Sequence, residues 1–370
     1  MEKTENIVIV GAGPIGIETA ALLKRRGINA RHIDAGPIAA TLDWWAPGTK
    51  FFSSPERLEI AGVPLVTRDQ EKATREEYMA YLRAVATQFK LPIETYTKLI
   101  HAERLEASNA PDAPRFRLKL QRQPARQTDP QSHSQPTETV LAKNLILATG
   151  NMDLPRLIGV KGETTTPWVS HYLKDPHHYY GKSVLIVGGK NSAVEAAIRL
   201  YRVGAKVAVS YRRDRFDPER IKYWLLPELE WLIEKGRIVF HPETVPESFE
   251  PGATTLRRLN PQAIKEHGGD TFKTASDFVL LLTGYDQDKT LFETLGVDLS
   301  GEEQRPLFNR ENMQTSIDGL FVAGTATGGS QKRAKVFIET SHVHAQRIAA
   351  TLAGESTNSP DPEYGRLEEA

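Results

Sequence analysis

The feature that most constrains the fold is a glycine turn near the start of the chain. Ile7–Val10 is a short run of β-branched residues, as is typical of a strand, and the turn Gly11–Gly16 follows it directly. A helical stretch is predicted at Ile15–Arg26 and a second strand at Ala30–Asp34. This order of strand, glycine turn, helix and strand indicates the βαβ unit of a dinucleotide-binding fold.

Each glycine of the turn Gly11-Ala12-Gly13-Pro14-Ile15-Gly16 has a separate physical role. Gly11 permits the tight turn, Gly13 lets the backbone approach a pyrophosphate, and Gly16 lets helix and strand pack closely. The free N–H groups at the start of the helix attract phosphates. Asp34 lies 21 residues after Gly13 and is placed to accept hydrogen bonds from ribose hydroxyls. We therefore predict that this turn binds FAD.

The same order of elements returns in the second half of the chain. Ser183–Val187 is predicted as a strand, Gly188–Ala193 as a turn, Val194–Val203 as a helix and Lys206–Ser210 as another strand. The two turns are about 175 residues apart, and 370 residues suit two domains of ordinary size. The sequence therefore predicts an α/β protein with two Rossmann-like, three-layer domains.

The second turn departs from the first in ways that bear on its ligand. In Gly188-Gly189-Lys190-Asn191-Ser192-Ala193 a lysine takes the middle glycine's place, and the position of Asp34 is held by Tyr211. Arg212 and Arg213 follow directly. Loss of the acid removes repulsion against a ribose 2′-phosphate, and the guanidinium groups supply its counter-charge. NADPH is therefore favoured over NADH; the structural alternative is a solvated basic turn.

A stretch of unusual composition lies between the two turns. Ala107–Thr139 is rich in Pro, Gln, Ser and Asp and contains the strand-like segment Arg115–Leu120. We predict a hairpin excursion with a long mobile tip at about 121–137. A loop that binds a partner is the functional alternative.

Two further apolar strands suggest the domain boundaries. Asn144–Thr149 runs into an Ala-Thr-Gly sequence, and Gly319–Ala323 runs into Ala-Gly-Thr ahead of a helix predicted from about 334 to 353. Because the apolar pattern of the first domain resumes near residue 300, we predict that the NADPH domain is inserted into the FAD domain. The expected ranges are 1–160 with 300–354 for FAD, 161–299 for NADPH, and 355–370 for a disordered tail.

Composition excludes several classes of function. Lys+Arg and Asp+Glu both total 47, so no nucleic-acid partner is expected. No apolar run is long enough to span a bilayer, and the N-terminus has no pattern of a signal peptide, so the expected location is the cytoplasm. The cysteine count is zero, which excludes a disulfide, a thiolate metal site, a Cys nucleophile and a CxxC redox pair. Any redox chemistry must then be carried by a bound cofactor.

Other polar and aromatic residues give weaker signals. His342 and His344 are two apart on the predicted helix and so face different ways, and His177–His178 lies in a loop, so no metal site is expected. The aromatic residues just after the first βαβ unit suit either core packing or a wall of the flavin or substrate pocket; they are Trp44, Trp45, Phe51 and Phe52.

The two dinucleotide turns, Ala-Thr-Gly after the first domain and the Ala-Gly strand near the C-terminus resemble the thioredoxin-reductase-like flavoproteins. Longer strings over nearly the whole chain resemble the bacillithiol-disulfide reductase family within that group. They are Phe51–Ile60, Val169–Tyr172, Gly188–Ser192, Thr283–Tyr285 and Phe337–Glu339. The resemblance implies FAD and NADPH as cofactors and a low-molecular-weight disulfide as the small-molecule acceptor. It also implies a homo-oligomer, a dimer or tetramer.

The departures from that family concern how electrons leave the flavin. Members commonly carry a cysteine with an assigned redox role at the position of Ile15, and thioredoxin reductase proper needs a CxxC pair; this chain has neither. The flavin-binding Asp after the Ala-Gly strand is replaced by Thr325. Ser170-His171 ahead of a Gly-x-x-Asn-Ser-Ala turn also resembles class B flavin monooxygenases. That activity, and a non-catalytic pyridine-nucleotide sensor, are the two alternative functions.

Each cofactor has its own set of expected contact residues. The expected FAD residues are Gly11, Gly13, Pro14, Ile15, Gly16, Asp34, Ala35, Phe51, Phe52, Thr149, Gly150, Gly324 and Thr325. The expected NADPH residues are Gly188, Gly189, Lys190, Asn191, Ser192, Tyr211, Arg212 and Arg213. No residue has an evident general-acid role, and His171 is the single catalytic candidate, with a plain loop histidine as its alternative.

Overall fold

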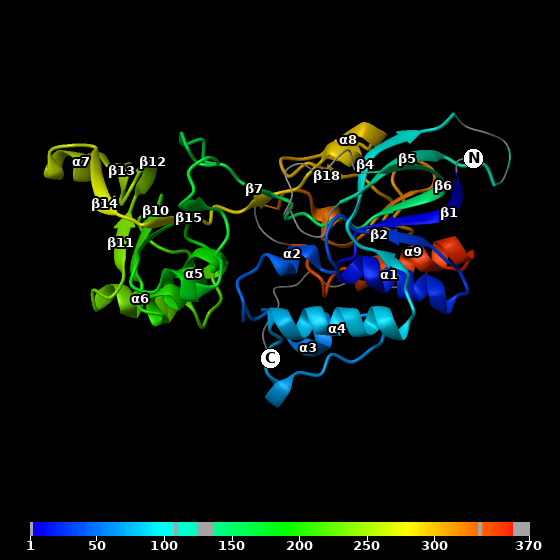
Figure 1. The fold of residues 1–370 in the computed structure, drawn as a ribbon, viewed down its shortest axis with the longest axis horizontal. Coiled ribbons are helices and arrows are strands. Elements are labelled where there is room, and N and C mark those ends of the chain that lie inside the picture. Colours follow the sequence, from blue (N-terminus) through cyan, green and yellow to red (C-terminus); the bar gives the residue numbers. More distant parts are fainter. Residues whose placement is uncertain (1–2, 107–109, 111, 124–135, 332–334, 358–370) are drawn as a thin grey trace. The chain divides into compact units, whose positions relative to one another are not determined.

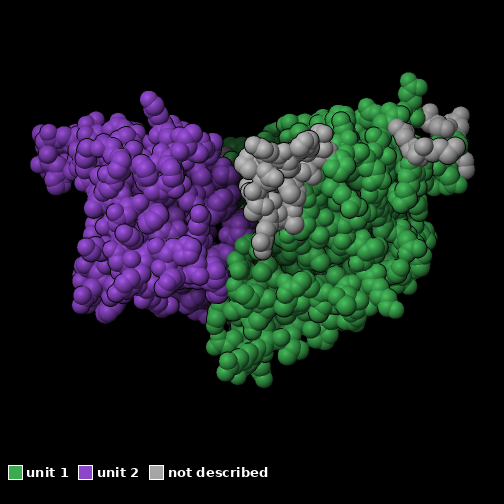
Figure 2. All heavy atoms as spheres, in the orientation of Figure 1, with its two compact units in different colours: residues 1–43, 50–154, 285–370 green, residues 44–49, 155–284 purple. Residues whose placement is uncertain are grey.

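The structure is a computed structural model that describes residues 3–106, 110, 112–123, 136–331 and 335–357. The chain divides into two compact units, which Figure 2 distinguishes by colour. Unit 1 contains residues 1–43, 50–154 and 285–370, and unit 2 contains residues 44–49 and 155–284. Each unit has its own sheet and its own core, so each is described by itself.

Unit 1 is built on a seven-stranded sheet with the order β3-β2-β1-β6-β5-β4 and with β19 also paired to β6. Its strands are β1 (Lys3–Val10), β2 (Arg31–Ile33), β3 (Ile93–Glu94), β4 (Thr97–Arg104), β5 (Phe116–Arg122), β6 (Thr137–Leu147) and β19 (Leu320–Val322). The pairs among β3, β2, β1, β6 and β19 are parallel, whereas β4, β5 and β6 form an antiparallel meander.

Strand β6 is shared between these two arrangements. Its first half, Thr137–Ala142, pairs antiparallel with β5, and its second half, Leu145–Leu147, pairs parallel with β19. Along the opposite edge, β6 pairs with β1 throughout Val140–Leu147. The predicted excursion is therefore a hairpin of two strands of the main sheet, and residues 124–135 of its predicted tip lie outside the described residues.

Both faces of the unit 1 sheet are covered, as the sequence of β1 requires. Ile7 and Ile9 lie in one apolar cluster with residues of α1 and α9, while Val8 and Val10 lie in a second cluster with the meander and α8. Alternate residues of a strand point to opposite faces, so an unbroken apolar strand is buried on both. The helices of this unit are α1 (Pro14–Arg25), α2 (Ala40–Asp43), α3 (Pro55–Leu58), α4 (Arg75–Gln88), α8 (Thr290–Leu295) and α9 (His342–Ala353). Figure 1 shows α1 and α9 on one side of this sheet.

Short elements complete unit 1. The 3₁₀ turns are η1 (Arg68–Gln70) and η4 (Gly324–Gly328), and a small antiparallel pair joins β17 (Leu299–Ser300) to β18 (Arg305–Pro306). The two segments in which the chain passes from one unit to the other also pair as strands. They are β7 (Leu154–Pro155) and β16 (Tyr285–Asp286).

Unit 2 is built on a five-stranded sheet in which every strand is parallel to its neighbours, with the order β11-β10-β9-β15-β8. Its strands are β8 (Val169–Ser170), β9 (Ser183–Val187), β10 (Lys206–Tyr211), β11 (Val239–Pro242) and β15 (Phe278–Leu281). This second parallel sheet, with helices between its strands, confirms the prediction of an α/β fold with two dinucleotide-type sheets.

The two faces of the unit 2 sheet are covered differently. Helices α5 (Asn191–Arg202) and α6 (Leu226–Glu234) pack on one face with the larger apolar cluster. A three-stranded antiparallel sheet packs on the other through Leu256. That sheet consists of β12 (Thr244–Glu250), β13 (Ala253–Arg258) and β14 (Thr271–Ala275), and the remaining elements are α7 (Pro261–His267), η2 (Pro176–Tyr179) and η3 (Pro218–Arg220).

The C-terminal helix is shorter than predicted. Helix α9 begins at His342, and residues 335–341 form coil and turns instead of the predicted helix from about 334. Side-chain acceptors explain this difference, because the Oε1 atom of Gln331 accepts from the backbone N–H of Lys335 and satisfies it outside a helix. Residues 332–334 lie outside the described residues.

Two further properties hold for the described residues. None of their helices is both long enough and apolar enough to cross a membrane. Nor do they contain a group of three or more His, Asp or Glu side chains that could hold a metal ion.

Candidate functional site

The parallel part of the unit 1 sheet brings three of the predicted FAD-binding segments together. Val10 pairs with Leu147, and Leu147 pairs with Val322, so β1, β6 and β19 end at the same edge. The predicted segments follow these ends directly, as Gly11–Gly16, Thr149–Gly150 and Gly324–Thr325. Ligands of open α/β sheets bind outside the carboxyl ends of the strands, and this edge is therefore the candidate dinucleotide site.

The three glycines of the first turn differ in what surrounds them. A Cβ atom on Gly11 would lie 2.3 Å from the Ala148 carbonyl oxygen, and one on Gly16 would lie 1.9 Å from that of Gly11. A Cβ atom on Gly13 would meet nothing within 4 Å. Gly11 and Gly16 are thus needed for packing, whereas Gly13 leaves space at the N-cap of α1, where a pyrophosphate would be held. The turn fits the pyrophosphate of FAD.

Asp34 closes this turn. Its carboxylate accepts hydrogen bonds from the backbone N–H of Ala12 at 2.6 Å and of Gly36 at 2.7 Å. Burial raises the pKa of Asp34, and these two hydrogen bonds oppose that shift. Each carboxylate oxygen has a further lone pair, so the group can brace the turn and still accept from a ribose hydroxyl. Ala35 lies between Asp34 and Gly36 in the same loop.

A histidine that sequence reasoning missed also supports the turn. His32 is fully buried in β2, and its Nε2 atom lies 2.9 Å from the Gly11 carbonyl oxygen. Burial lowers the pKa of His32 to about 4, against the opposing effect of this hydrogen bond. The ring is therefore neutral near pH 7, with its single proton on Nε2 and donated to Gly11. No motif marks this residue, because a histidine in a short strand is compatible with many structures.

Two more side chains connect the segments at this sheet edge, and neither was predicted. Gln287 is buried, and its Nε2 atom donates to the carbonyl oxygens of Gly150 at 3.0 Å and Ala326 at 2.8 Å. The backbone N–H of Gly324 donates to Nδ1 of His344 at 3.2 Å. These bonds connect residues up to 137 positions apart in the sequence, which no local pattern reveals.

The predicted aromatic residues lie in two different surroundings. Phe51 is buried in unit 1 against Tyr78, with ring centroids 4.7 Å apart. Phe52 lies beneath the ammonium group of Lys72, which is 4.9 Å from its ring centroid. Trp44 belongs to unit 2, where its ring is 4.9 Å from that of Tyr172. Core packing thus accounts for Phe51, and Phe52 is the more accessible of the two predicted flavin contacts.

The second turn, in unit 2, is closed by packing and not by a carboxylate. A Cβ atom on Gly188 would lie 2.5 Å from the Leu282 carbonyl oxygen, and one on Gly189 would lie 2.4 Å from the Tyr211 ring. Tyr211 is buried and stacks on Phe216 with an interplanar angle of 8°. The residue in the place of the usual acid therefore covers the turn with a flat apolar surface and brings no negative charge.

Positive charge is concentrated around this turn. Lys190 occupies the N-cap of α5, and burial lowers its pKa. Neighbouring guanidinium groups lower that pKa further; they belong to Arg220, Arg156, Arg212 and Arg213. A group of cations at a helix N-terminus favours a phosphate ligand. The predicted residues Asn191 and Ser192 begin α5, and the Oδ1 atom of Asn191 accepts from the backbone N–H of Lys222 at 2.6 Å.

The catalytic candidate, His171, is buried in unit 2 just after β8. Its Nε2 atom lies 3.6 Å from the carboxylate of Glu163, which itself accepts hydrogen bonds from the backbone N–H groups of Ile158 and Gly159. This arrangement suits a buried structural pair as well as a proton-holding group, so a catalytic role of His171 stays a prediction.

Comparisons with known proteins agree with this geometry. The sequence pattern of the pyridine nucleotide-disulphide oxidoreductase family matches residues 8–108 and 132–324. The bacilliredoxin reductase of Bacillus subtilis (strain 168) is 33% identical over 350 residues, which cover 94% of this chain and 98% of that protein. The solved bacillithiol disulfide reductase of Bacillus cereus is 29% identical, with a TM-score of 0.83 over 95% of this chain and 99% of the other.

A more distant structure supports the fold alone. The thioredoxin reductase of T. acidophilum is 18% identical and has a TM-score of 0.67, covering 95% of this chain and 99% of that one. It shares the arrangement of two dinucleotide-type domains that the two turns predicted.

The chain belongs to the pyridine nucleotide-disulphide oxidoreductase family. It is thus an oxidoreductase, and within that family it is similar to the bacilliredoxin and bacillithiol disulfide reductases. This membership confirms the resemblance stated from the sequence and the prediction of FAD and NADPH as cofactors.

Proposed function

We propose that the protein passes electrons from NADPH through FAD to a small disulfide, of which bacillithiol disulfide is the best candidate. The similarity to the Bacillus subtilis bacilliredoxin reductase and to the Bacillus cereus bacillithiol disulfide reductase supports this choice of acceptor. The net reaction consumes one NADPH, one proton and one disulfide, and it yields NADP⁺ and two thiols.

The observation that carries the proposal is the unfilled space at Gly13. Its neighbours Gly11 and Gly16 are fixed by backbone contacts, and Asp34 braces the loop beside it. Pro14 and Ile15 begin the helix whose N–H groups face this space. The turn is thus fixed by packing at Gly11 and Gly16 and leaves space at Gly13, where a diphosphate would lie.

In this proposal the other FAD residues lie at the same sheet edge. Thr149, Gly150, Gly324 and Thr325 would surround the cofactor beyond its pyrophosphate, with Thr325 Oγ1 lying 3.9 Å from a Cβ atom built on Gly150. Gln287 keeps the two loops in register by donating to both. FAD, when bound, supplies the two-electron chemistry, and the protein positions it and excludes side reactions.

Unit 2 would hold NADPH. We propose that Gly188, Gly189 and Lys190 hold its diphosphate and that Arg212 and Arg213 contact the 2′-phosphate, with Tyr211 as an apolar support. The concentration of cations around Lys190 supports this proposal. The division of the chain at 154–155 and 284–285 also supports the insertion of an NADPH domain into an FAD domain.

The route by which electrons leave must differ from one that uses a protein thiol. The chain contains no cysteine, and Ile15 stands where the related family commonly carries a redox cysteine. Ile15 is buried against the segment at Gly324, so this position is part of the core. We therefore propose that the acceptor reaches the flavin directly and that protein residues position it without forming a covalent intermediate.

The test is turnover under anaerobic conditions. Purified protein loaded with FAD is mixed with NADPH and bacillithiol disulfide, and NADPH absorbance and thiol release are followed together. One NADPH consumed for every two thiols released supports the proposal. NADPH consumption only when oxygen is admitted would instead point to a monooxygenase. Absence of turnover with disulfides, quinones and oxygen would favour a sensor of pyridine nucleotides.

A further inference from the structure

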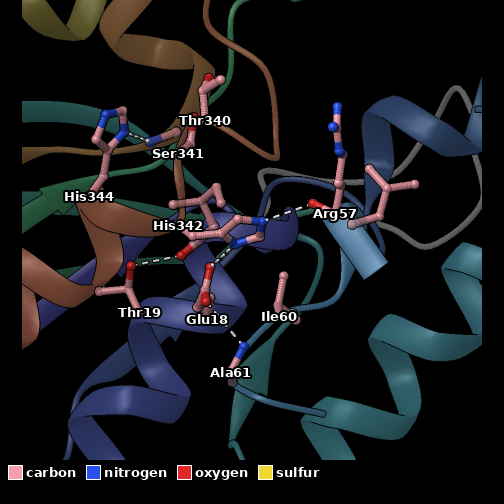
Figure 3. A network of polar contacts seen from close by, with 12 residues as sticks. Glu18, Thr19, Arg57, Ile60, Ala61, Thr340, Ser341, His342 and His344 are labelled. Carbon is pink, nitrogen blue, oxygen red and sulfur yellow. Dashed lines mark hydrogen bonds and ion pairs between the residues drawn. The ribbon is translucent and has the colours of Figure 1, made fainter. Parts of the chain in front are cut away.

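A partly buried ion pair joins the helix of the first glycine turn to the C-terminal helix. The carboxylate of Glu18, on α1, and the imidazole of His342, the first residue of α9, approach to 2.8 Å between Oε2 and Nδ1. The other carboxylate oxygen of Glu18 accepts from the backbone N–H of Ala61 at 3.1 Å. The remaining ring nitrogen of His342, Nε2, lies 3.1 Å from the Arg57 carbonyl oxygen. Figure 3 shows the carboxylate between the histidine and Ala61.

The proton count of this network follows from its partners. A carbonyl oxygen can only accept, so Nε2 of His342 must donate to Arg57. The carboxylate of Glu18 also accepts, so Nδ1 must donate as well and the ring is an imidazolium. Burial by itself lowers the pKa of His342, but the hydrogen bond and charge of Glu18 outweigh it, and the net shift is upward from 6.5.

Residues in the first turn of α9 contact two segments of the candidate FAD site, which are helix α1 and the segment at Gly324. Glu18 lies one helical turn beyond the Gly13 N-cap of α1, so its bond to His342 fixes the helix that faces the pyrophosphate. Two residues further along α9, His344 accepts from the backbone N–H of Gly324, in the second of these segments. The position of α9 therefore determines how α1 and the segment at Gly324 lie relative to each other within unit 1.

Further hydrogen bonds connect the loop that carries Phe52 to this network. Ser53 donates to the carboxylate of Glu339 at 2.6 Å, which connects the loop carrying Phe52 to the segment before α9. Arg57 and Ala61, which complete the His342 network, lie on the chain that continues from this loop. A change at His342 therefore reaches three segments around the candidate site.

We propose that His342 is a positioning residue whose imidazolium form holds the first glycine turn in its FAD-binding arrangement, so that FAD is held less tightly when this proton is lost. The inference rests on the proposed function, since it requires that FAD binds at Gly11–Gly16. It adds a regulation of that site by pH, through residues that contact neither the pyrophosphate nor the ribose.

Several charged and titratable groups surround His342. The nearby charged and titratable groups from the surrounding elements are Glu18, Arg57, Glu59, Tyr78, Tyr81, Glu339 and His344. Burial raises the pKa of Tyr78 well above its usual range and that of Tyr81 to about 12, so both stay neutral. His344 accepts a hydrogen bond at Nδ1 from the backbone N–H of Gly324.

The direction of the effect follows from the raised pKa. The imidazolium contributes its full stabilisation below about pH 6.5, and the contribution is lost as pH rises through the higher pKa of the folded protein. Neutral His342 has one proton for two acceptors, so either Glu18 or Arg57 then loses its donor. Loss of one charge-assisted hydrogen bond corresponds to an increase of about tenfold in the FAD dissociation rate.

The variant Glu18→Gln separates the proton from the geometry. The glutamine oxygen can accept from Ala61, and its amide can donate to Nδ1 of a neutral His342 whose Nε2 proton still reaches Arg57. Every hydrogen bond is kept without the extra proton. His342→Gln is a second variant, because it also removes the titrating group. Glu56→Gln is the matched control, since Glu56 is an exposed carboxylate on the neighbouring α3.

The experiment measures FAD release from the full-length protein between about pH 6 and pH 9, by dilution, ultrafiltration and flavin absorbance of the filtrate. The wild type and Glu56→Gln are expected to release FAD about tenfold faster at the upper end, whereas Glu18→Gln and His342→Gln are expected to show no such rise. A titrating imidazole resonance present in the NMR spectrum of the wild type and missing from that of His342→Gln should have a pKa above 6.5.

Equal pH dependence in the wild type and in both variants would overturn the inference, as would a wild-type release rate that does not change with pH. A preparation that retains no FAD at any pH would instead contradict the proposed function. If Glu18→Gln does not fold, the comparison of the wild type with His342→Gln decides the question alone.

Discussion

The two glycine turns are equivalent in backbone and opposite in chemistry. In each, the first glycine donates its N–H to a carbonyl of the neighbouring strand, from Gly11 to Ile33 at 2.9 Å and from Gly188 to Ser210 at 3.1 Å. The first turn is then closed by a carboxylate, whereas the second is covered by the ring of Tyr211. From this comparison we expect the backbone to set where a dinucleotide lies and the closing side chain to select which dinucleotide is accepted.

The turns also differ in the titratable groups that lie near them. Near the first turn, burial lowers the pKa of His32 to about 4, whereas the contact of His342 with Glu18 outweighs burial and raises the pKa of His342. Near the second turn, Ser210 of β10 and Thr244 form a buried polar contact, with their hydroxyl oxygens 2.8 Å apart. Such a hydroxyl pair does not titrate in the physiological range. A titratable group does lie at the second turn itself, where burial lowers the pKa of Lys190, so binding of the nicotinamide nucleotide is expected to weaken as pH rises through that pKa.

The largest effect is expected from substitutions within the first turn. Gly16→Ala places a methyl group 1.9 Å from the Gly11 carbonyl oxygen, so it should lower the free energy of unfolding by about 3 kcal/mol and abolish FAD binding. Gly13→Ala meets no protein atom within 4 Å and should keep its stability to within about 0.5 kcal/mol while FAD binding is lost. Chemical denaturation and flavin absorbance measure both quantities. A Gly13→Ala protein that binds FAD normally would contradict the position assigned to the pyrophosphate.

Acid should destabilise unit 1 through His32. Because the pKa of this buried ring is lowered from 6.5 to about 4, the stabilisation is fully present above pH 6.5 and is lost as pH falls toward 4. The loss should reach about 3 kcal/mol at the lower limit. Denaturation curves collected across this range for the wild type and His32→Gln give the contribution by difference. His101→Gln, at an exposed histidine of β4, is the control and should follow the wild type.

The charge of the second turn should decide the choice between NADPH and NADH. Replacing both Arg212 and Arg213 with Ala is expected to raise the dissociation constant for NADPH about thirtyfold and to leave that for NADH nearly unchanged. Titration of flavin or nucleotide fluorescence measures both constants. Arg237→Ala, at an exposed arginine of the same unit, should change neither constant. Equal weakening of both nucleotides in the double variant would show that the 2′-phosphate lies elsewhere.

The smallest expected effect is none at all. Because the chain has no cysteine, treatment with a thiol-alkylating reagent should leave the rate of NADPH-dependent turnover unchanged. A relative with a redox cysteine is the positive control and should lose activity under the same conditions. Inactivation of this protein would reveal a second nucleophile that takes part in the reaction.

Local signals explain how much could be predicted from the sequence. The two turns, the strands that precede them and the helices that follow are encoded by short apolar runs and glycines, and the structure has them within a few residues. The predicted start of α9 was wrong by eight residues, because Gln331 and other side chains form hydrogen bonds with backbone N–H groups before the helix. Such side-chain competition is not visible in hydrophobic periodicity.

The supporting residues of the site lay beyond sequence reasoning for a different reason. Glu18 and His342 are 324 positions apart, and Gln287 reaches a carbonyl 137 positions away. Neither pair forms a motif, since each depends on how distant strands come together. The cofactor contacts inferred from sequence patterns stay a prediction, whereas the residues that hold the loops in place were missed by those patterns.

The sharing of β6 has a consequence for the order of assembly. Its partner β19 begins at Leu320, and helix α9, which packs on the unit 1 sheet, ends at Ala353. Both are therefore synthesised after the strands of unit 2. The parallel sheet of unit 2 lies wholly within residues 155–284 and can form before them. Closing the sheet of unit 1 requires contacts of long sequence separation, which form slowly. We therefore expect unit 2 to be folded on the ribosome while unit 1 still waits for β19 and α9.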